Sequence, residues 1–213
     1  RQMCIRDREY KPGFFEFDLK EWDTNELGHI RLAVPGRHNI YNALAMCAVC
    51  RSVGLTVEEC ANAALNFKGA GRRFEVYGEC NGAVVVDDYA HHPRELAATL
   101  TSVRKMFPGR RITALFQPHL YTRTRDLHAE FAEALSHADE VVLLPIYPAR
   151  EEPIPGVTSE LIARHVAVPC RIVGREALAD TVAAMDTDVV VSFGAGNIDA
   201  CCEALAEKLG EKS

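Results

Sequence analysis

The sequence predicts an α/β fold in which a mostly parallel sheet carries helices on both of its faces. From about residue 84 onward, short valine-rich runs alternate with amphipathic segments. These segments are about ten or more residues long, which is the length that a crossover between parallel strands requires. The chain has 213 residues and is 48% apolar, so it can bury one large core or two modest cores.

The amino-terminal part is predicted to contain two strands. Residues 1–8 show neither the alternation of a strand nor the apolar stripe of a helix, and we interpret them as a cloning or assembly scar outside the fold. Apolar and polar residues alternate over 14–19 and 29–34, on either side of the polar stretch 21–28. This pattern predicts two half-buried strands at the end of a sheet.

Two helices follow these strands. A Pro-Gly pair ends the second strand, and Asn39 or a neighbour can cap the helix after it. Thr56 opens a second helix with two glutamates in its first turn, and the Lys-Gly-Ala-Gly sequence at 68–71 ends it. We place a domain boundary there, so that 9–70 is the tail of one domain and 71–213 is a second domain.

The second domain is predicted to alternate strands with helices. The expected strands are 84–87, 112–116, 140–144, 171–173 and 189–193. The expected helices are 93–106, 126–136, 159–165, 177–185 and a final one after the last strand. In such folds ligands bind at the carboxyl ends of the strands. The polar segments described below lie at or near these ends, apart from the pair Asn39 and Asn42.

Charge and cysteine content exclude several classes of protein. A net charge of −6 argues against binding nucleic acid through its phosphates. No apolar run reaches the roughly 18 residues of a membrane span, and no signal peptide is recognisable, so we expect a cytosolic protein. The eight cysteines lack the paired spacing of a zinc ribbon, and we assign no metal ligands. Cys47 and Cys50 lie within a predicted helix and are expected to be buried thiols.

Two polar segments follow predicted strands. In the first, Asp87-Asp88-Tyr89-Ala90-His91-His92 precedes Pro93, whose helix would direct free amides at the same place, as in a pocket for a phosphorylated ligand. The alternative is that one aspartate caps the helix and the histidines are solvated. The second segment, residues 116–126, contains two arginines that can bind a carboxylate or a phosphate, or can simply form a solvated turn.

Three further segments carry weaker signals. Asn39 and Asn42 lie one helical turn apart and can bind a hydroxyl group or a purine edge, unless Asn39 is only a cap. Arg72-Arg73 offers paired cations at the predicted hinge. Residues 194–197, Gly-Ala-Gly-Asn, permit close backbone approach to a ligand.

The order of these five segments resembles that of the Mur ligase family. The matching stretches include G-R-H-N-x-x-N-A, G-A-G-R-R-F-E, D-D-Y-A-H-H-P and F-Q-P-H-x-Y-T-R-T-R-D, and the likeness runs from about residue 30 to the end. The resemblance implies a three-domain enzyme: a domain for the UDP-sugar, a central ATPase of the phosphate-loop type, and a carboxy-terminal Rossmann-like domain. This chain would then hold the tail of the second domain and all of the third.

The last two motifs point to the branch of the family that joins L-alanine to UDP-N-acetylmuramate in peptidoglycan synthesis. The implied reaction uses ATP and Mg²⁺ and passes through an acyl phosphate. The magnesium ligands and the phosphate loop are expected upstream, because no G-x-x-x-x-G-K-[S/T] occurs here. We therefore expect this chain alone to fold without turning over substrate.

Two groups of site residues carry over by motif. The nucleotide side comprises Asn39, Asn42, Arg73, Asp88 and Tyr89, with His38 as a weaker candidate. The side of the alanine and the reacting carboxylate comprises His91, His119, Arg123 and Arg125. The sequence departs from the family at Leu120, where some members have arginine, and at Asn197, where many have aspartate, and we assign Asn197 no role.

Three other functions stay open. The related ligase that reattaches a recycled tripeptide to the same nucleotide sugar shares the D-D-Y-like motif, although it is not expected to carry the Q-P-H-x-Y-x-R-T-R-D run. A non-catalytic nucleotide-binding module would need neither a phosphate loop nor a substrate domain. A nicotinamide dehydrogenase is disfavoured, because its glycine fingerprint belongs after the first strand. The sequence fixes neither the oligomeric state nor the choice among alanine, serine and glycine.

Overall fold

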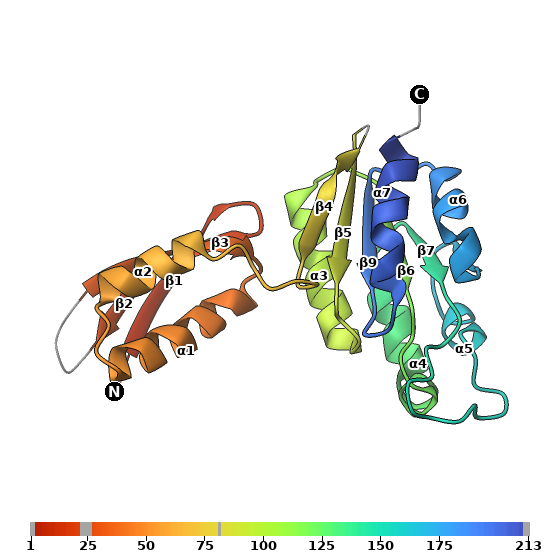
Figure 1. Ribbon diagram of the computed structural model, residues 1–213, viewed down its shortest axis with the longest axis horizontal. Coiled ribbons are helices and arrows are strands. Elements are labelled where there is room, and N and C mark those ends of the chain that lie inside the picture. Colours follow the sequence, from red (N-terminus) through yellow and green to blue (C-terminus); the bar gives the residue numbers. More distant parts are fainter. Residues whose placement is uncertain (1–2, 22–26, 81, 211–213) are drawn as a thin grey trace. The chain divides into compact units, whose positions relative to one another are not determined.

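The computed structural model describes residues 3–21, 27–80 and 82–210, which form two compact units. Unit 1 is Arg1–Gly69 and unit 2 is Ala70–Ser213 (Figure 1). Within the part of the chain that is described, no helix is long and apolar enough to cross a membrane.

Unit 1 packs two helices against one face of an antiparallel sheet. The strands, in order across the sheet, are β1 (Met3–Lys11), β2 (Phe14–Glu21) and β3 (Leu27–Pro35), and the helices are α1 (His38–Ser52) and α2 (Val57–Asn66). Phe15, Phe17 and Leu19 alternate along β2 and are buried against the helices. The strands predicted over 14–19 and 29–34 are confirmed.

Strand β1 corrects the interpretation of residues 1–8. It pairs with β2 from Met3 to Lys11, so the exclusion of residues 3–8 from the fold is wrong. The strand has no apolar face of its own that a pattern search could find. It is held by main-chain pairing and by an ion pair between Arg8 and the buried Glu16, because the register of an edge strand is set by its partner.

Unit 2 is built on a six-stranded sheet in the order β4-β5-β9-β6-β7-β8. Its strands are β4 (Glu75–Cys80), β5 (Ala83–Asp88), β6 (Ile112–Phe116), β7 (Glu140–Leu143), β8 (Cys170–Ile172) and β9 (Val189–Phe193). Its helices are α3 (Pro93–Met106), α4 (Tyr121–Leu135), α5 (Glu160–Ala163), α6 (Leu178–Ala183) and α7 (Cys202–Gly210), with short turns η1 (Arg175–Ala177) and η2 (Ile198–Cys201). Neighbouring strands are parallel except β4 and β5.

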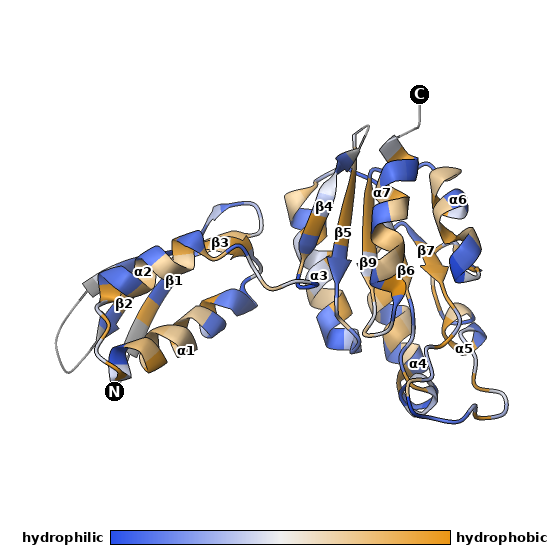
Figure 2. Cartoon of the chain, viewed as in Figure 1, coloured by the Kyte–Doolittle hydropathy of each residue, from blue (hydrophilic) through white to orange (hydrophobic). Residues whose placement is uncertain are grey.

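The sheet is the middle of three layers. One core contains Val84 and Val86 of β5 with residues of α3, α4 and α5, and the other contains Val85 with residues of α6 and α7. Figure 2 shows the result: β5 and β9 are mostly apolar, whereas the covering helices carry apolar and polar faces. The predicted parallel sheet with helices on both faces is confirmed.

Two elements of unit 2 differ from expectation. The sequence did not predict β4, an antiparallel edge strand with a bulge between Val76 and Gly78, because its partly exposed, irregular pattern gives no clear alternation. Helix α4 begins at Tyr121 instead of Asp126, and Leu127 interrupts its helical geometry. The first turn of α4 therefore contains the residues that were expected to form a loop.

Candidate functional site

The loops that follow β5, β6 and β9 meet at the carboxyl edge of the sheet. In register, Asp88 of β5 lies opposite Phe193 of β9, which lies opposite Phe116 of β6. The ring centroids of His91 and His119 are 6.4 Å apart. The predicted convergence of the loops after Asp88 and Gln117 is thus confirmed.

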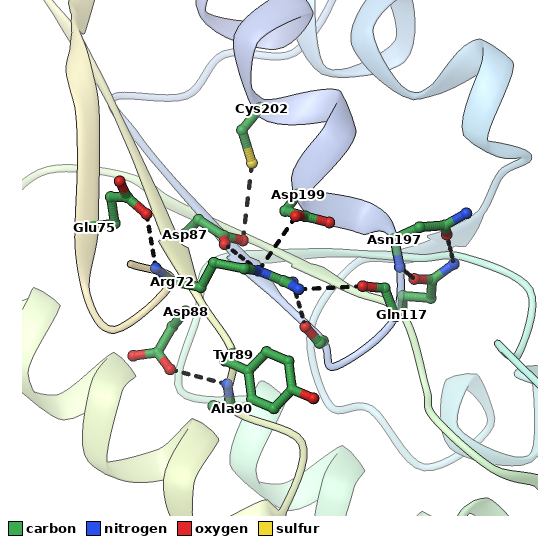
Figure 3. Close-up of polar contacts among 12 residues, drawn as sticks. Arg72, Glu75, Asp87, Asp88, Tyr89, Ala90, Gln117, Asn197, Asp199 and Cys202 are labelled. Atoms are coloured by element: carbon green, nitrogen blue, oxygen red, sulfur yellow. Dashed lines mark hydrogen bonds and ion pairs between the residues drawn. The ribbon is translucent and has the colours of Figure 1, made fainter. Parts of the chain in front are cut away.

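Arg72 is the centre of the polar contacts at this edge (Figure 3). Its Nε donates to Oδ2 of the fully buried Asp87 at 3.0 Å. Its two Nη atoms donate to the carbonyl oxygens of Gly194 at 2.6 Å and Gly196 at 3.2 Å. Burial raises the pKa of Asp87, and Arg72 opposes that shift. The contacts fasten the start of unit 2 to the ends of β5 and β9.

Asp88 is turned into the protein. Its Oδ1 accepts from the amide of Ala90 at 2.9 Å, and its Oδ2 accepts from the hydroxyl of Thr99 at 3.0 Å. Burial raises the pKa of Asp88, while these two hydrogen bonds lower it. The carboxylate therefore shapes the turn that presents Tyr89, because both of its oxygens already have protein donors.

Helix α3 has its own cap. Nδ1 of His92 accepts from the amide of Arg94 at 3.4 Å, and Glu95 accepts from the amide of His92 at 3.2 Å. The alternative in which Asp87 or Asp88 caps this helix is wrong. His91 is held separately, with Nδ1 at 3.0 Å from the carbonyl oxygen of Tyr89 and its amide donating to Glu95 at 2.9 Å.

Tyr89 lies between two cations. The guanidinium carbon of Arg72 is 5.0 Å from the ring centroid, and that of Arg73 is 5.6 Å away. Arg73 is exposed, whereas Arg72 is largely covered. Adjacent arginines thus have different environments: Arg72 is committed to internal partners, and Arg73 presents its charge to solvent beside an aromatic ring.

His119 and Arg123 supply nitrogen atoms without protein partners. Nδ1 of His119 and Nη1 of Arg123 are buried and make no hydrogen bond. Burial lowers the pKa of His119, and the nearby Arg123 and His91 lower it further. An imidazole nitrogen and a guanidinium donor that are buried without partners need an explanation. A bound ligand that accepts a hydrogen bond from Arg123 would provide one for the guanidinium.

Arg125 has a different environment from Arg123. It is exposed, and its Nε donates to Oδ1 of the adjacent Asp126 at 2.7 Å. The two arginines are both in the first turns of α4, but only Arg123 has a buried nitrogen that lacks a partner.

The Gly-Ala-Gly-Asn segment packs against the Gln117 loop. Gln117 and Asn197 form a reciprocal pair, in which the amide of Asn197 donates to Oε1 at 3.0 Å and Nε2 donates to Oδ1 of Asn197 at 3.1 Å. A Cβ at Gly196 would lie 2.8 Å from Cγ of Tyr147. The glycine at this position is therefore required for contact between loops.

Asn39 and Asn42 belong to unit 1, in the first turn and a half of α1. Nδ2 of Asn39 donates to the carbonyl oxygen of Pro35 at 2.7 Å, and Nδ2 of Asn42 donates to Oδ1 of Asn39 at 2.8 Å. The helix begins at His38 without a side-chain cap, so the interpretation of Asn39 as a simple cap is wrong. The pair lies on one face of the helix start, as predicted.

The described residues of this chain do not form a magnesium site by themselves. Among residues 3–21, 27–80 and 82–210, no group of three or more His, Cys, Asp or Glu side chains is arranged to hold a metal ion. The two adjacent aspartates at the end of β5 already have protein partners.

Sequence reasoning named Arg72 only as one of two paired cations and gave it no role of its own, and it missed Tyr147 and Glu151. Tyr147 stacks on His119, with centroids 5.7 Å apart and planes 15° apart. Glu151 accepts from the amide of Thr122 at 2.9 Å. Both lie in the loop after β7, at the same carboxyl edge, so the rule that ligands gather there could have drawn attention to them.

Comparison with known proteins supports the resemblance. The sequence matches the family described as "Mur ligase, glutamate ligase domain" over residues 72–196. It is 45% identical over 181 residues to a UDP-N-acetylmuramate–L-alanine ligase of Parabacteroides distasonis, covering 84% of this chain and 39% of that protein. The corresponding protein of Caldicellulosiruptor bescii is 40% identical over 207 residues, covering 94% of this chain and 45% of that protein.

The fold agrees with these matches. The crystal structure of a UDP-N-acetylmuramate–alanine ligase from Thermotoga maritima superposes with a TM-score of 0.77 at 25% identity, over 97% of this chain and 45% of that one. The chain thus spans about two fifths of the length of the curated relatives it matches. On the family match and these relatives together, the chain belongs to the Mur ligase family.

Proposed function

We propose that this chain is the carboxy-terminal part of an ATP-dependent ligase that joins L-alanine to UDP-N-acetylmuramate. The name of the relatives at 40–45% identity supports this substrate choice. A murein peptide ligase from Psychrobacter arcticus is 21% identical, which supports the common fold alone. In this proposal, residues 9–70 are the tail of the central domain and residues 71–213 are the carboxy-terminal domain.

The observation that carries the proposal is the pair of buried nitrogens without partners, on His119 and Arg123. In our proposal, Arg123 binds the carboxylate of alanine, because a guanidinium donates to both carboxylate oxygens. A neutral His119, with His91 beside it, then lies close to the reacting groups. Arg125 adds positive charge from the exposed side of the same turn.

The nucleotide side of the proposal rests on an exposed cation and a half-buried ring in unit 2, and on two side-chain amides in unit 1. Arg73 and Tyr89 present a cation and a ring at the carboxyl edge of unit 2, and Asp88 shapes the turn between them. Asn39 and Asn42 of unit 1 offer amide groups suited to adenine or ribose. Magnesium would be held mainly by residues of the parent enzyme that this chain does not contain.

The proposed reaction runs in two steps. The γ-phosphoryl group of ATP passes to the lactyl carboxylate, which releases ADP and gives an acyl phosphate. The deprotonated amine of alanine then attacks the acyl carbon, and the nitrogen of the tetrahedral intermediate loses a proton to solvent. The intermediate expels inorganic phosphate to leave the amide. Residues of this chain contribute by positioning the amino acid and neutralising negative charge. The chain by itself should fold and release no phosphate from ATP.

Steady-state ligation by the parent enzyme tests the assignment, with Arg125→Ala as the matched control for Arg123→Ala. Loss of a charge-assisted hydrogen bond costs about 1.5–3 kcal/mol, so kcat/KM for alanine should fall roughly 10- to 150-fold in Arg123→Ala. The exposed, ion-paired Arg125 should give a smaller loss. Arg73→Ala should raise KM for ATP instead. Wild-type kcat/KM in both Arg73→Ala and Arg123→Ala would overturn the assigned roles.

A further inference from the structure

We propose that the loop over residues 144–159, between β7 and α5, is the positioning element for the acceptor side of the site. It acts through two residues, Tyr147 and Glu151, which hold His119 and the start of α4 in place. This inference rests on the proposed function only for the identity of the ligand. The positioning itself can be measured without it.

Tyr147 contacts the loop that carries His119 through its main-chain atoms and through its aromatic ring. The amide of Tyr147 donates to the carbonyl oxygen of Pro118 at 2.8 Å, and the amide of Leu120 donates to the carbonyl oxygen of Tyr147 at 3.0 Å. These two bonds bracket His119. The tyrosine ring stacks on the imidazole with the planes 15° apart. The stacking therefore restrains the plane of the His119 ring, whose Nδ1 makes no hydrogen bond.

Glu151 replaces the missing cap of α4. The residue before this helix, Leu120, has no side chain that can accept a hydrogen bond, and the first amides of a helix need acceptors. Glu151 supplies them from across the edge: Oε2 accepts from the amide of Thr122 at 2.9 Å, and Oε1 accepts from its hydroxyl. These bonds, the hydroxyl of Thr122 first, lower the pKa of Glu151, and the amide of Tyr121 adds to the effect.

The cap fixes the direction of Arg123. Because Arg123 directly follows Thr122, the angle at which α4 starts decides where the guanidinium lies. Leu120 turns the chain into the helix with φ of +73°, and its carbonyl oxygen accepts from the hydroxyl of Thr124 at 2.8 Å. The turn is strained and has little freedom to compensate for a lost cap.

Gly196, in the segment after β9, packs against the other side of Tyr147. A Cβ there would lie 2.8 Å from Cγ and 3.0 Å from Cβ of Tyr147. The ring of Tyr147 is therefore packed between the segment after β9 and the imidazole of His119. We infer that a shift of the 144–159 loop would move the Tyr147 ring and, with it, the imidazole of His119.

The first measurement uses this 213-residue chain. Side-chain NMR of the histidines should show His119 ring protons shifted by the ring current of Tyr147. Tyr147→Leu should abolish that shift, and Tyr147→Phe should keep it. Backbone amide spectra of both variants verify folding. An unchanged His119 signal in folded Tyr147→Leu overturns the inference.

The second measurement uses the ligation assay of the parent enzyme. In Glu151→Ala, a misplacement of Arg123 by about 1 Å should lower kcat/KM for alanine by roughly 10- to 100-fold. KM for ATP should stay within about twofold of wild type, since a positioning role on the acceptor side does not touch the nucleotide. Glu151→Gln keeps one acceptor oxygen for the amide of Thr122, and its NH2 group can donate to the hydroxyl oxygen of Thr122, so this variant should restore most of the loss. The exposed neighbour Glu152 supplies the control variant, Glu152→Ala.

The outcomes distinguish the positioning role of the 144–159 loop from the assignment of this sheet edge to the acceptor. Equal losses for alanine and ATP, or no rescue by Glu151→Gln, would mean that the loop serves general stability and would overturn the inference. If the NMR result holds while neither Glu151→Ala nor Arg123→Ala affects ligation, the assignment of this edge to the acceptor is wrong. A parent enzyme that does not ligate alanine at all would overturn the proposed function instead.

Discussion

Replacing Arg72 by methionine should destabilise unit 2 far more than the same change at Arg73. The Asp87 carboxyl group is fully buried, and Arg72 is its cationic partner at 3.0 Å. Removing one member of a buried pair costs about 3–5 kcal/mol, because the remaining charge has no compensation. Two carbonyl oxygens, of Gly194 and Gly196, lose their donors as well. Arg73 is exposed, so Arg73→Met should change the free energy of unfolding by less than about 0.5 kcal/mol.

Protonation of Asp87 limits the loss and makes it depend on pH. The ordinary pKa of this group is 3.8, so neutralising it at pH 7 costs about 4 kcal/mol, and at pH 5 about 1.6 kcal/mol. Without Arg72, burial raises the pKa of Asp87 in the folded state with much less opposition. A raised carboxyl pKa contributes stability below the unfolded value and loses it as pH rises. The deficit of Arg72→Met should therefore grow from about pH 4 to pH 7.

Urea unfolding at pH 5 and pH 7 measures the deficit, and hydrogen exchange with mass spectrometry assigns it to β5 and β9. Arg72→Met combined with Asp87→Asn should recover part of the lost stability, since no buried charge remains. If Arg72→Met and Arg73→Met are equally stable, or if the deficit does not change with pH, then the Arg72 network does not hold this edge together.

Three further predictions concern packing, charge and capping. Gly196→Ala should push Tyr147 and Gln117 apart and lower the free energy of unfolding by about 1–3 kcal/mol, measured by urea denaturation, with no effect expected on unit 1. Hydrogen bonds from Arg8, the larger cause, and from Arg31 lower the pKa of Glu16 to about 2. The stability that this ionised group gives unit 1 is lost as pH falls from about 4.5 toward 2. Glu16→Gln should flatten that part of an acid titration followed by circular dichroism. Thr56→Ala removes the capping box of α2 and should cost about 0.5–2 kcal/mol by thermal or urea unfolding, and Thr56→Ser should restore it.

The elements that were predicted correctly are those whose own residues form a recognisable pattern. Helix α3 and strand β6 have the predicted limits, because a proline start with an acidic first turn and a fully buried apolar run are local patterns. The convergence of two polar loops followed from topology, since parallel strands that share a sheet also share a carboxyl edge.

The elements that were missed depend on residues distant in sequence. Strands β1 and β4 lie at sheet edges and are defined by their pairing with β2 and β5. Helix α4 begins early because Glu151, which lies 29 positions from Thr122, accepts its first free amide. No pattern within residues 121–125 could reveal that acceptor.

Arg72 and Arg73 also show that a sequence pattern cannot reveal contacts made by residues distant in the chain. Arg72 has φ of +58°, which turns its side chain toward the end of β5, and the amide of Tyr89 donates to its carbonyl oxygen at 2.6 Å. Arg73 continues into the exposed side of the turn. Composition and spacing cannot separate two identical neighbours, because the separation is made by a backbone angle and by the buried Asp87.

The two departures from the family pattern leave the edge intact for a common reason: each position is used through atoms that both residue types share. Asn197 receives a hydrogen bond at Oδ1 and donates its main-chain amide to Gln117, and an aspartate has the same oxygen and the same amide. Leu120 contributes its amide and its carbonyl oxygen, to Tyr147 and Thr124, and an arginine would make the same main-chain bonds. The loop around Gln117 can thus keep its contacts with either residue type at both positions. In our proposal, the carboxylate-binding charge that an arginine at 120 would add falls to Arg123.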